Sequence, residues 1–359
     1  MRAVTTCLLS ALLLPASAAA GDLNVYNWAG YIGEETVAAF EAESGLEVAY
    51  DTFDTLETLE AKLLAGNSGY DLVVYVGPYA PRLIEIGVFR PLDRERLPGW
   101  ENLDPAVLPA FAESDPGNEH GLPYLWSTTG ITYNVAQVKE RLGGIPQNAA
   151  DLIFDPAVAA KLADCGISLF DSPTDILPLA LAYWGYAPSS DEAADYEAIA
   201  GRLAAVRPYV RHFDNQQYNA RLAAGELCVA TTWSGDYARA EEAAAEAGRP
   251  VELGYGIPVT GAPIWFDAFF IPTDAPHPEA AHDFLAYLLR PEVMAEISEE
   301  LKIASANAAA TALLPAELTE NPAIYPDQSV KERLFVVRPL SHEAEQARTR
   351  LWTRFKTGR

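Results

Sequence analysis

The feature that most constrains the fold is the alternation of strand-like and helix-like segments at the start of the chain. Three short segments, 23–26, 46–50 and 72–76, combine apolar and β-prone side chains and predict strands. The segments 34–43 and 56–65 carry apolar residues at helical spacing. A β-α-β-α-β order implies a parallel sheet with right-handed crossover connections. The sequence therefore predicts an α/β fold.

A second α/β unit follows an irregular stretch rich in Pro, Asp and Gly. Strand and helix patterns alternate again over residues 167–257, and two strand-like stretches, 124–133 and 264–271, flank that unit. We interpret these two stretches as crossings between lobes, since 359 residues are enough for two lobes. We expect a ligand cleft between the lobes, because such a cleft is a usual binding site closed by hinge motion. The expected lobes are residues 21–131 plus 262–308 and residues 132–261 plus 309–359.

Residues 1–20 have the parts of a secretory signal peptide. Arg2 is the positive start, Leu8–Leu14 is a short apolar stretch, and the small residues that follow provide a cleavage site. No later segment reaches the length of apolar sequence that a membrane helix needs, so we expect a soluble, exported mature protein. Cys165 and Cys228 remain after cleavage, and an oxidising compartment favours a disulfide between them. Two free buried thiols are the alternative.

Charge and motifs exclude several function classes. The formal net charge of −25 argues against binding to nucleic acid or to anionic membranes. It is compatible with a cationic ligand, although solubility alone also explains it. The signatures G-x-S-x-G, H-E-x-x-H and the phosphate-binding P-loop are absent from the sequence, and the five histidines lack metal-ligand spacing. We therefore expect no enzyme activity, cofactor or metal, with a dispersed catalytic triad as the alternative.

Three clusters combine aromatic residues with an acid or a loop glycine. They are Trp28 with Tyr31, the segment 232–236, and the segment 265–267 just before an apolar strand. Alkylammonium groups need both kinds of neighbour, because carboxylates pair with the charge and aromatic faces cover the methylenes. Each cluster also has a structural explanation: the aromatic residues could be core, and Asp236 could cap a helix. Together the three clusters favour a cation pocket.

Short motifs spread over nearly the whole mature chain carry a resemblance to a known family. They are Val25-Tyr26-Asn27-Trp28 with Tyr31, Lys62–Gly66, Tyr70–Val74, Pro91-Leu92-Asp93, Pro123-Tyr124 with Trp126, Thr129-Gly130-Ile131, Trp233–Asp236, Trp265-Phe266-Asp267 and Tyr287–Pro291. This set resembles the spermidine/putrescine-binding periplasmic proteins of polyamine ABC transporters, and it is closest to the putrescine-binding branch. The resemblance implies a two-lobed class II periplasmic-binding-protein fold. It also implies a monomer that delivers a small cationic amine to an inner-membrane ABC permease.

The resemblance also suggests residue roles. The implied ligand-binding residues are Trp28, Tyr31, Trp233 and Trp265 as an aromatic box, Asp236 and Asp267 as partners of ammonium groups, and Asp175 in place of a pocket glutamate. The putrescine-binding branch also has a cysteine at each of the positions that match Cys165 and Cys228.

Three departures from the family pattern concern one end of the expected pocket. Gly30 stands where the family has an acid, Val76 where it has a serine, and Ile303 where the putrescine branch has a tyrosine. Either another acid substitutes, with Glu34, Glu35 and Asp171 as candidates, or the ligand carries less positive charge at that end. The alternatives to putrescine are therefore spermidine, agmatine or a monocationic amine. A ligand-sensing subunit, a secreted enzyme and a structural protein are the alternatives from other classes.

Overall fold

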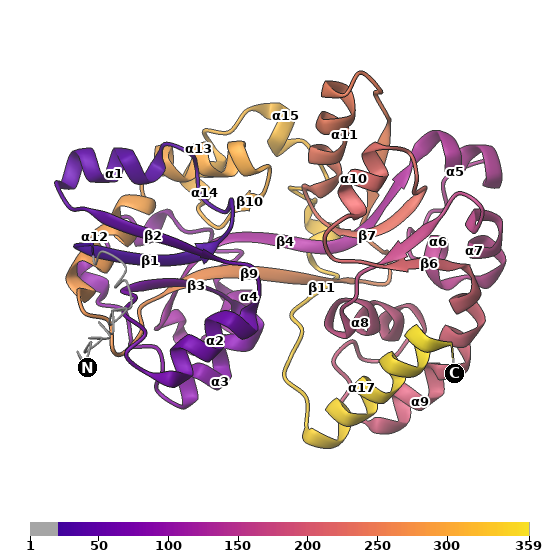
Figure 1. Cartoon of the computed structure of the whole chain (residues 1–359), viewed down its shortest axis with the longest axis horizontal. Coiled ribbons are helices and arrows are strands. Elements are labelled where there is room, and N and C mark those ends of the chain that lie inside the picture. Colours follow the sequence, from indigo (N-terminus) through magenta and orange to yellow (C-terminus); the bar gives the residue numbers. More distant parts are fainter. Residues whose placement is uncertain (1–20, 359) are drawn as a thin grey trace, which may run out of the picture.

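The computed structural model describes residues 21–358, and the predicted signal peptide at residues 1–20 lies outside the described residues. The chain forms two lobes joined by two long strands, β4 and β9 (Figure 1). The strand order along the main path of the sheet is β2-β1-β3-β9-β4-β7-β5-β6. This architecture confirms the predicted two-lobed α/β fold.

The first lobe begins with the predicted alternation of strands and helices. Its parallel strands pair in the order β2-β1-β3, and β3 is buried along most of its length, as its continuous apolar sequence predicts. The bounds are β1 Leu23–Trp28, α1 Thr36–Ser44, β2 Val48–Phe53, α2 Leu56–Ala65, β3 Leu72–Val76 and α3 Ala80–Glu85. The irregular stretch that follows holds α4, Leu108–Phe111, and short 3-10 turns at Arg94–Arg96, Trp100–Asn102 and Pro116–Asn118.

The two crossing strands are the structural link between the lobes. Strand β4, Gly121–Asn134, pairs antiparallel with β9, Ala262–Phe270, through its first half and with β7 through its second half. Both strands match the crossings that the sequence predicts. The third aromatic–acid cluster lies inside β9 rather than just before a strand, so that detail of the sequence interpretation was wrong.

The second lobe repeats the parallel arrangement around β5 and β7. Strand β5 pairs in parallel with β6 and β7, while β8 pairs antiparallel with β4. The strands are β5 Ile167–Leu169, β6 Val210–Phe213, β7 Val229–Trp233 and β8 Leu253–Gly256. The helices are α5 Val135–Leu142, α6 Asp151–Phe154, α7 Pro156–Leu162, α8 Pro173–Tyr183, α9 Ala193–Val206, α10 Tyr218–Ala223 and α11 Asp236–Glu246.

A disulfide joins Cys165 and Cys228 in the second lobe, with their Cα atoms 5.5 Å apart. Cys165 lies just before β5 and Cys228 just before β7, so the bond ties together two neighbouring strands of the sheet. The structure thus has the predicted disulfide and not the free thiols.

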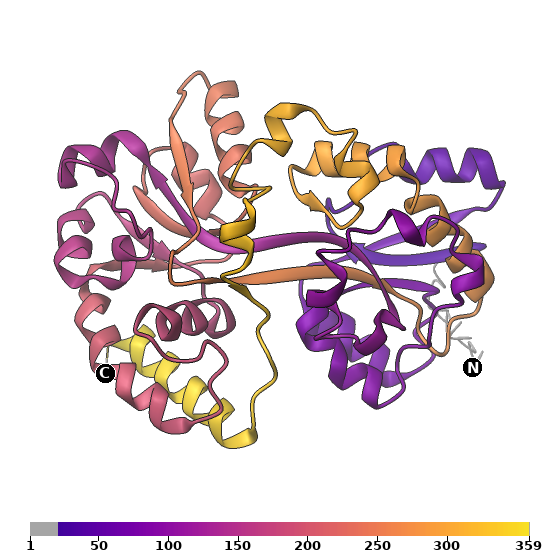
Figure 2. The same cartoon turned by 180° about the vertical axis from the view of Figure 1, so that it is seen from behind.

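The C-terminal third of the chain returns to the first lobe and then crosses once more. Figure 2 shows the last segment passing beside β4 and β9 on its way to α17, and β11 on that path pairs with β9. The elements are α12 Pro278–Leu288, α13 Pro291–Leu301, β10 Ala304–Ser305, α14 Ala308–Thr311, α15 Ala316–Thr319, α16 Gln328–Lys331, β11 Leu334–Phe335 and α17 His342–Thr357.

Each lobe has its own hydrophobic core. The core of the first lobe includes Leu314, Leu318 and Ile324, whereas Leu351 and Phe355 of α17 belong to the second. The lobe boundaries expected from the sequence remain a prediction. The packing of these residues favours a last boundary that lies C-terminal to residue 308.

Candidate functional site

The first-lobe end of the candidate site is built around the carboxyl group of Asp267. Strand β1 ends at Trp28, and Gly30 with φ 62° turns the chain so that Tyr31 faces β9. The Tyr31 hydroxyl donates a hydrogen bond of 2.8 Å to Oδ2 of Asp267. The other carboxyl oxygen, Oδ1, is buried and has no hydrogen-bond partner in the described structure. A buried carboxylate oxygen without a donor is unusual and needs a partner.

Burial raises the pKa of Asp267 to about 6. The Tyr31 hydroxyl and the Trp28 indole partly oppose this rise in pKa. A carboxylate that has left water and has not found a cation is costly. The Asp267 end of the site therefore favours a bound positive charge.

The second-lobe end is built around Asp175 at the N-terminus of α8. Asp175 is 5% exposed, and its carboxyl oxygens accept hydrogen bonds from Thr129, at 2.7 Å, and from Ser172, at 2.6 Å. Burial raises the pKa of Asp175, and these hydroxyls and the Trp233 indole oppose the rise. Both direct donors are neutral hydroxyls, so the negative charge of Asp175 is solvated by dipoles but not neutralised.

Trp265 connects the two ends of the site. Its indole N–H donates to Thr129 Oγ1 at 2.7 Å, and that hydroxyl in turn donates to Asp175. Trp265 and Asp267 are two residues apart on β9, so their side chains leave the same face of the strand. Trp265 is thus linked to Asp175 through Thr129 and shares a strand face with Asp267.

The other predicted aromatic residues also lie at this place. Trp233 stacks on Phe170 with ring centroids 4.4 Å apart, and Trp28 packs against Phe53 at 4.4 Å. Trp28, Tyr31 and Trp233 remain partly exposed, unlike the fully buried core aromatic residues. Trp28 thus packs in the first lobe and Trp233 in the second, and their indoles act on the pKa of Asp267 and of Asp175, respectively.

Asp236 has a different environment from the other two acids. It is 2% exposed, and one carboxyl oxygen accepts from the Tyr218 hydroxyl at 2.7 Å and from the backbone N–H of Trp233 at 3.2 Å. The other oxygen forms an ion pair with Arg239, one turn further along α11. The family resemblance implies that Asp236 is a partner of an ammonium group, and in the structure its carboxylate already pairs with a guanidinium.

None of the three acids considered as replacements at Gly30 takes its place in the structure. Glu34 and Glu35 are exposed, and Asp171 pairs with Lys356 of α17 at 2.7 Å. Val76 lies directly opposite Asp267 in the pairing of β3 and β9. Ile303 is buried. Gly30, Val76 and Ile303 therefore supply neither the acid nor the hydroxyls that the family pattern has at these positions.

Sequence reasoning missed the polar residues that support the acids. Ser172 could have been found, because a Ser three residues before an acid at a helix start is the signature of an N-terminal cap. Arg239 could have been found as a cation one helical turn after Asp236. Thr129 gave no local signal, because its partners, Asp175 and Trp265, are distant in sequence.

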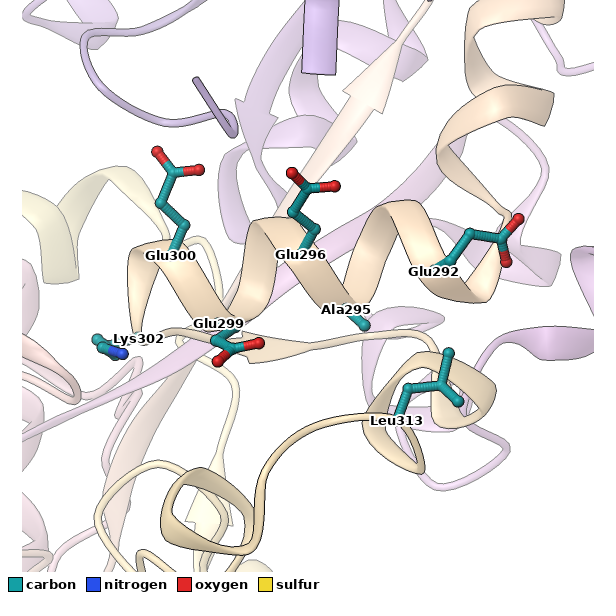
Figure 3. Close-up of a pocket in the computed structure, with 7 residues that line it drawn as sticks. All are labelled: Glu292, Ala295, Glu296, Glu299, Glu300, Lys302 and Leu313. Atoms are coloured by element: carbon teal, nitrogen blue, oxygen red, sulfur yellow. The ribbon is translucent and has the colours of Figure 1, made fainter. Parts of the chain in front are cut away.

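A separate surface pocket of about 480 Å³ lies along α13 and is not part of this site. Figure 3 shows Glu296 and Glu300 on one side of the helix and Glu299 on the other. The lining has no aromatic residue, so it lacks the combination of aromatic residues and acids found at the candidate site. Within residues 21–358 no cluster of His, Cys, Asp and Glu has the arrangement of a metal site. In the same residues no helix is both long and apolar enough to cross a bilayer.

Comparisons with known proteins agree with this architecture. The chain is 45% identical to the putrescine-binding periplasmic protein of Escherichia coli (strain K12), over 94% of this chain and 92% of that protein. It is 40% identical to the putrescine/agmatine-binding protein of Pseudomonas aeruginosa, over 95% of this chain and 93% of that protein.

A solved structure has the same fold. The spermidine/putrescine ABC transporter substrate-binding protein of Streptococcus pneumoniae superposes with a TM-score of 0.82 at 27% identity, covering 94% of this chain and 98% of that one. The family model for bacterial extracellular solute-binding proteins matches residues 35–326. Like the Escherichia coli relative, this chain is a periplasmic protein. The family resemblance read from the sequence is confirmed: the chain belongs to the bacterial extracellular solute-binding proteins.

Proposed function

We propose that this protein binds a small polyamine between its lobes and delivers it, as a monomer, to the inner-membrane permease of an ABC transporter. The observation that carries the proposal is the buried Asp267 oxygen without a donor, beside the Tyr31 hydroxyl and the Trp28 indole. An ammonium group supplies both the positive charge and the N–H donor that this oxygen lacks. No bond is made or broken in this role.

The arrangement of the remaining residues supports a ligand with two cationic ends. Asp267 receives one ammonium group, and Asp175 receives the other at the opposite end of Trp265. The indole faces cover the methylenes between the charges and add a cation–π attraction of ~0.5–2 kcal/mol. Relatives named for putrescine binding, at 45% and 43% identity, support the same class of ligand.

Isothermal titration calorimetry tests the proposal. Putrescine, spermidine, agmatine and a neutral amino acid are titrated into the wild-type protein, and the amines into Asp267→Asn. We expect binding of at least one amine and none of the amino acid. Loss of the carboxylate should weaken amine binding by about 100-fold, since leaving a buried charge without its partner commonly costs about 2–5 kcal/mol.

Asp164→Asn is the matched control, because Asp164 is an exposed aspartate that pairs with Arg141 on the surface. It should bind amines like the wild type. Failure of all three amines to bind the wild type at millimolar concentration would contradict the polyamine proposal. Equal affinity in Asp267→Asn and the wild type would contradict the assigned position of the ligand.

A further inference from the structure

Arg239 contacts both lobes. Its Nη2 forms the ion pair with Asp236, and its Nη1 donates to the backbone oxygen of Leu301, at 3.1 Å. Arg239 lies on α11 of the second lobe, whereas Leu301 ends α13, which packs in the first. The guanidinium therefore links the second-lobe acid to the first lobe.

The charge of Arg239 also acts on the end of the site that contains Asp267. Burial raises the pKa of Tyr31 well above its ordinary value, Asp267 raises it further, and Arg239 opposes the rise. Since Tyr31 donates to Asp267, the guanidinium lies within electrostatic range of that pair. The backbones of Gly235 and Lys302 also approach each other closely beside Arg239. A Cβ on Gly235 would lie 2.4 Å from the backbone oxygen of Lys302.

The balance of charge at the site follows from these contacts. Asp267 and Asp175 have only neutral side-chain donors, whereas Asp236 is neutralised by Arg239. These four groups together leave two negative charges for a ligand. A third ammonium group would meet the guanidinium in place of a free carboxylate, and it would be repelled.

We propose that Arg239 is a specificity-determining residue that limits the ligand to two positive charges by occupying Asp236 itself. The inference rests on the proposed function, because it concerns the amine-binding site. Diamines are then preferred over triamines. The departures at Gly30 and Val76 act in the same direction, because they remove an acid and a hydroxyl that the family pattern has at the opposite end.

Arg239→Gln tests the inference, because a glutamine amide can still donate to a backbone oxygen but carries no charge. Putrescine and spermidine are titrated into the wild type and this variant by calorimetry at pH 7.5. We expect the wild type to bind putrescine more tightly. In Arg239→Gln the affinity for spermidine relative to putrescine should rise by about tenfold, because Asp236 becomes available to a third charge.

Two further variants separate charge from structure. Arg239→Lys keeps the positive charge and should keep the wild-type preference. Arg141→Gln removes an exposed arginine that pairs with Asp164 and should change neither affinity. Circular dichroism and a thermal melt show whether each variant is folded.

The possible outcomes are distinct. An unchanged putrescine-to-spermidine ratio in folded Arg239→Gln would overturn the role of Arg239 and leave the proposed function intact. A wild type that prefers spermidine would also overturn it. A wild type that binds neither amine would instead contradict the proposed function, and the inference would fall with it.

Discussion

Asp236 and Asp267 stand two or three residues after a tryptophan, yet their carboxyl groups lie in opposite environments. Asp236 is saturated by a tyrosine hydroxyl, a backbone N–H and Arg239. Asp267 has one hydroxyl donor and one buried oxygen without a partner. The first acid is part of the framework of the second lobe, whereas in the proposed function the second acid pairs with a cation. Residue type and burial alone do not separate a structural acid from a ligand-binding acid, whereas the count of its donors does.

The largest expected effect on binding comes from placing a positive charge next to the free carboxylate. Val76 lies opposite Asp267 in the sheet, so a lysine at position 76 would bring an ammonium group close to it. Val76→Lys should abolish amine binding, because the lysine ammonium group pairs with Asp267 in place of the ligand. We expect the affinity for putrescine to fall by about 100-fold or more. Val76→Met, of similar length and without charge, is the control that shows the effect of bulk. Calorimetry with putrescine measures both, and equal losses would contradict the role of charge.

The two aspartates should affect the stability of the ligand-free protein in opposite directions. Asp236→Asn breaks an ion pair on a buried acid and leaves Arg239 without its partner, so it should lower the free energy of unfolding by about 2–4 kcal/mol. Asp267→Asn removes a buried charge that has no cation and should raise the free energy of unfolding by about 2–3 kcal/mol at pH 7.5. Urea denaturation of both variants measures the two values. Changes of the same sign in the free energy of unfolding would contradict the different roles assigned to the two acids.

Stability and amine affinity should both depend on pH through Asp267. The pKa of Asp267 is raised to about 6 in the folded protein, so the native state binds its proton more readily than the unfolded chain does. This acid therefore lowers stability above pH 6, and the loss is recovered as the pH falls toward the unfolded value near 4. Amine affinity should instead fall as the pH falls, because protonation removes the carboxylate that pairs with the amine. The expected decrease is up to about tenfold for each pH unit below 6. In Asp267→Asn the part of both trends that comes from this acid should disappear.

The smallest expected effect concerns the aromatic wall. Trp28 lies beside Asp267 and packs on Phe53, and its partial exposure suits a face that covers a ligand. Trp28→Leu should weaken putrescine binding by ~0.5–2 kcal/mol through the loss of cation–π attraction. Trp100→Leu is a matched control on another part of the first lobe, where the ring faces Arg94. A larger loss in the control than in Trp28→Leu would contradict the aromatic role.

The sequence predicts the fold because its signals are local. The apolar run of β3, the alternating strands and helices, and the two crossing strands depend on short-range patterns that tertiary contacts did not override. The positions of Trp28 and Asp236 could also be predicted from the sequence, because Trp28 ends a strand and Asp236 begins a helix. These patterns and the family resemblance led to the candidate aromatic residues and acids, and their roles in ligand binding stay a prediction.

The partners of each acid could not be predicted in the same way. The chain of hydrogen bonds from Trp265 through Thr129 to Asp175 depends on how β4 lies against β9 and α8. The state of Asp236 depends on a rotamer of Arg239 that also reaches Leu301 across the lobes. Such contacts join distant parts of the chain, so one sequence does not determine them.

The most direct test of the central claim is the proton released when putrescine binds. At pH 5.5 the ligand-free Asp267 is mostly protonated, because its pKa is about 6. An ammonium group that pairs with this acid must drive the proton off, since only the carboxylate form gains the charge interaction. Calorimetry in two buffers of different ionisation enthalpy measures the protons exchanged.

The account predicts release of at least ~0.5 proton per putrescine bound by the wild type at pH 5.5, and a clearly smaller release in Asp267→Asn. It also predicts that Asp236→Asn releases as much as the wild type, since Asp236 is paired before the ligand arrives. Equal proton release by the wild type and Asp267→Asn would contradict the claim that Asp267 receives the cation.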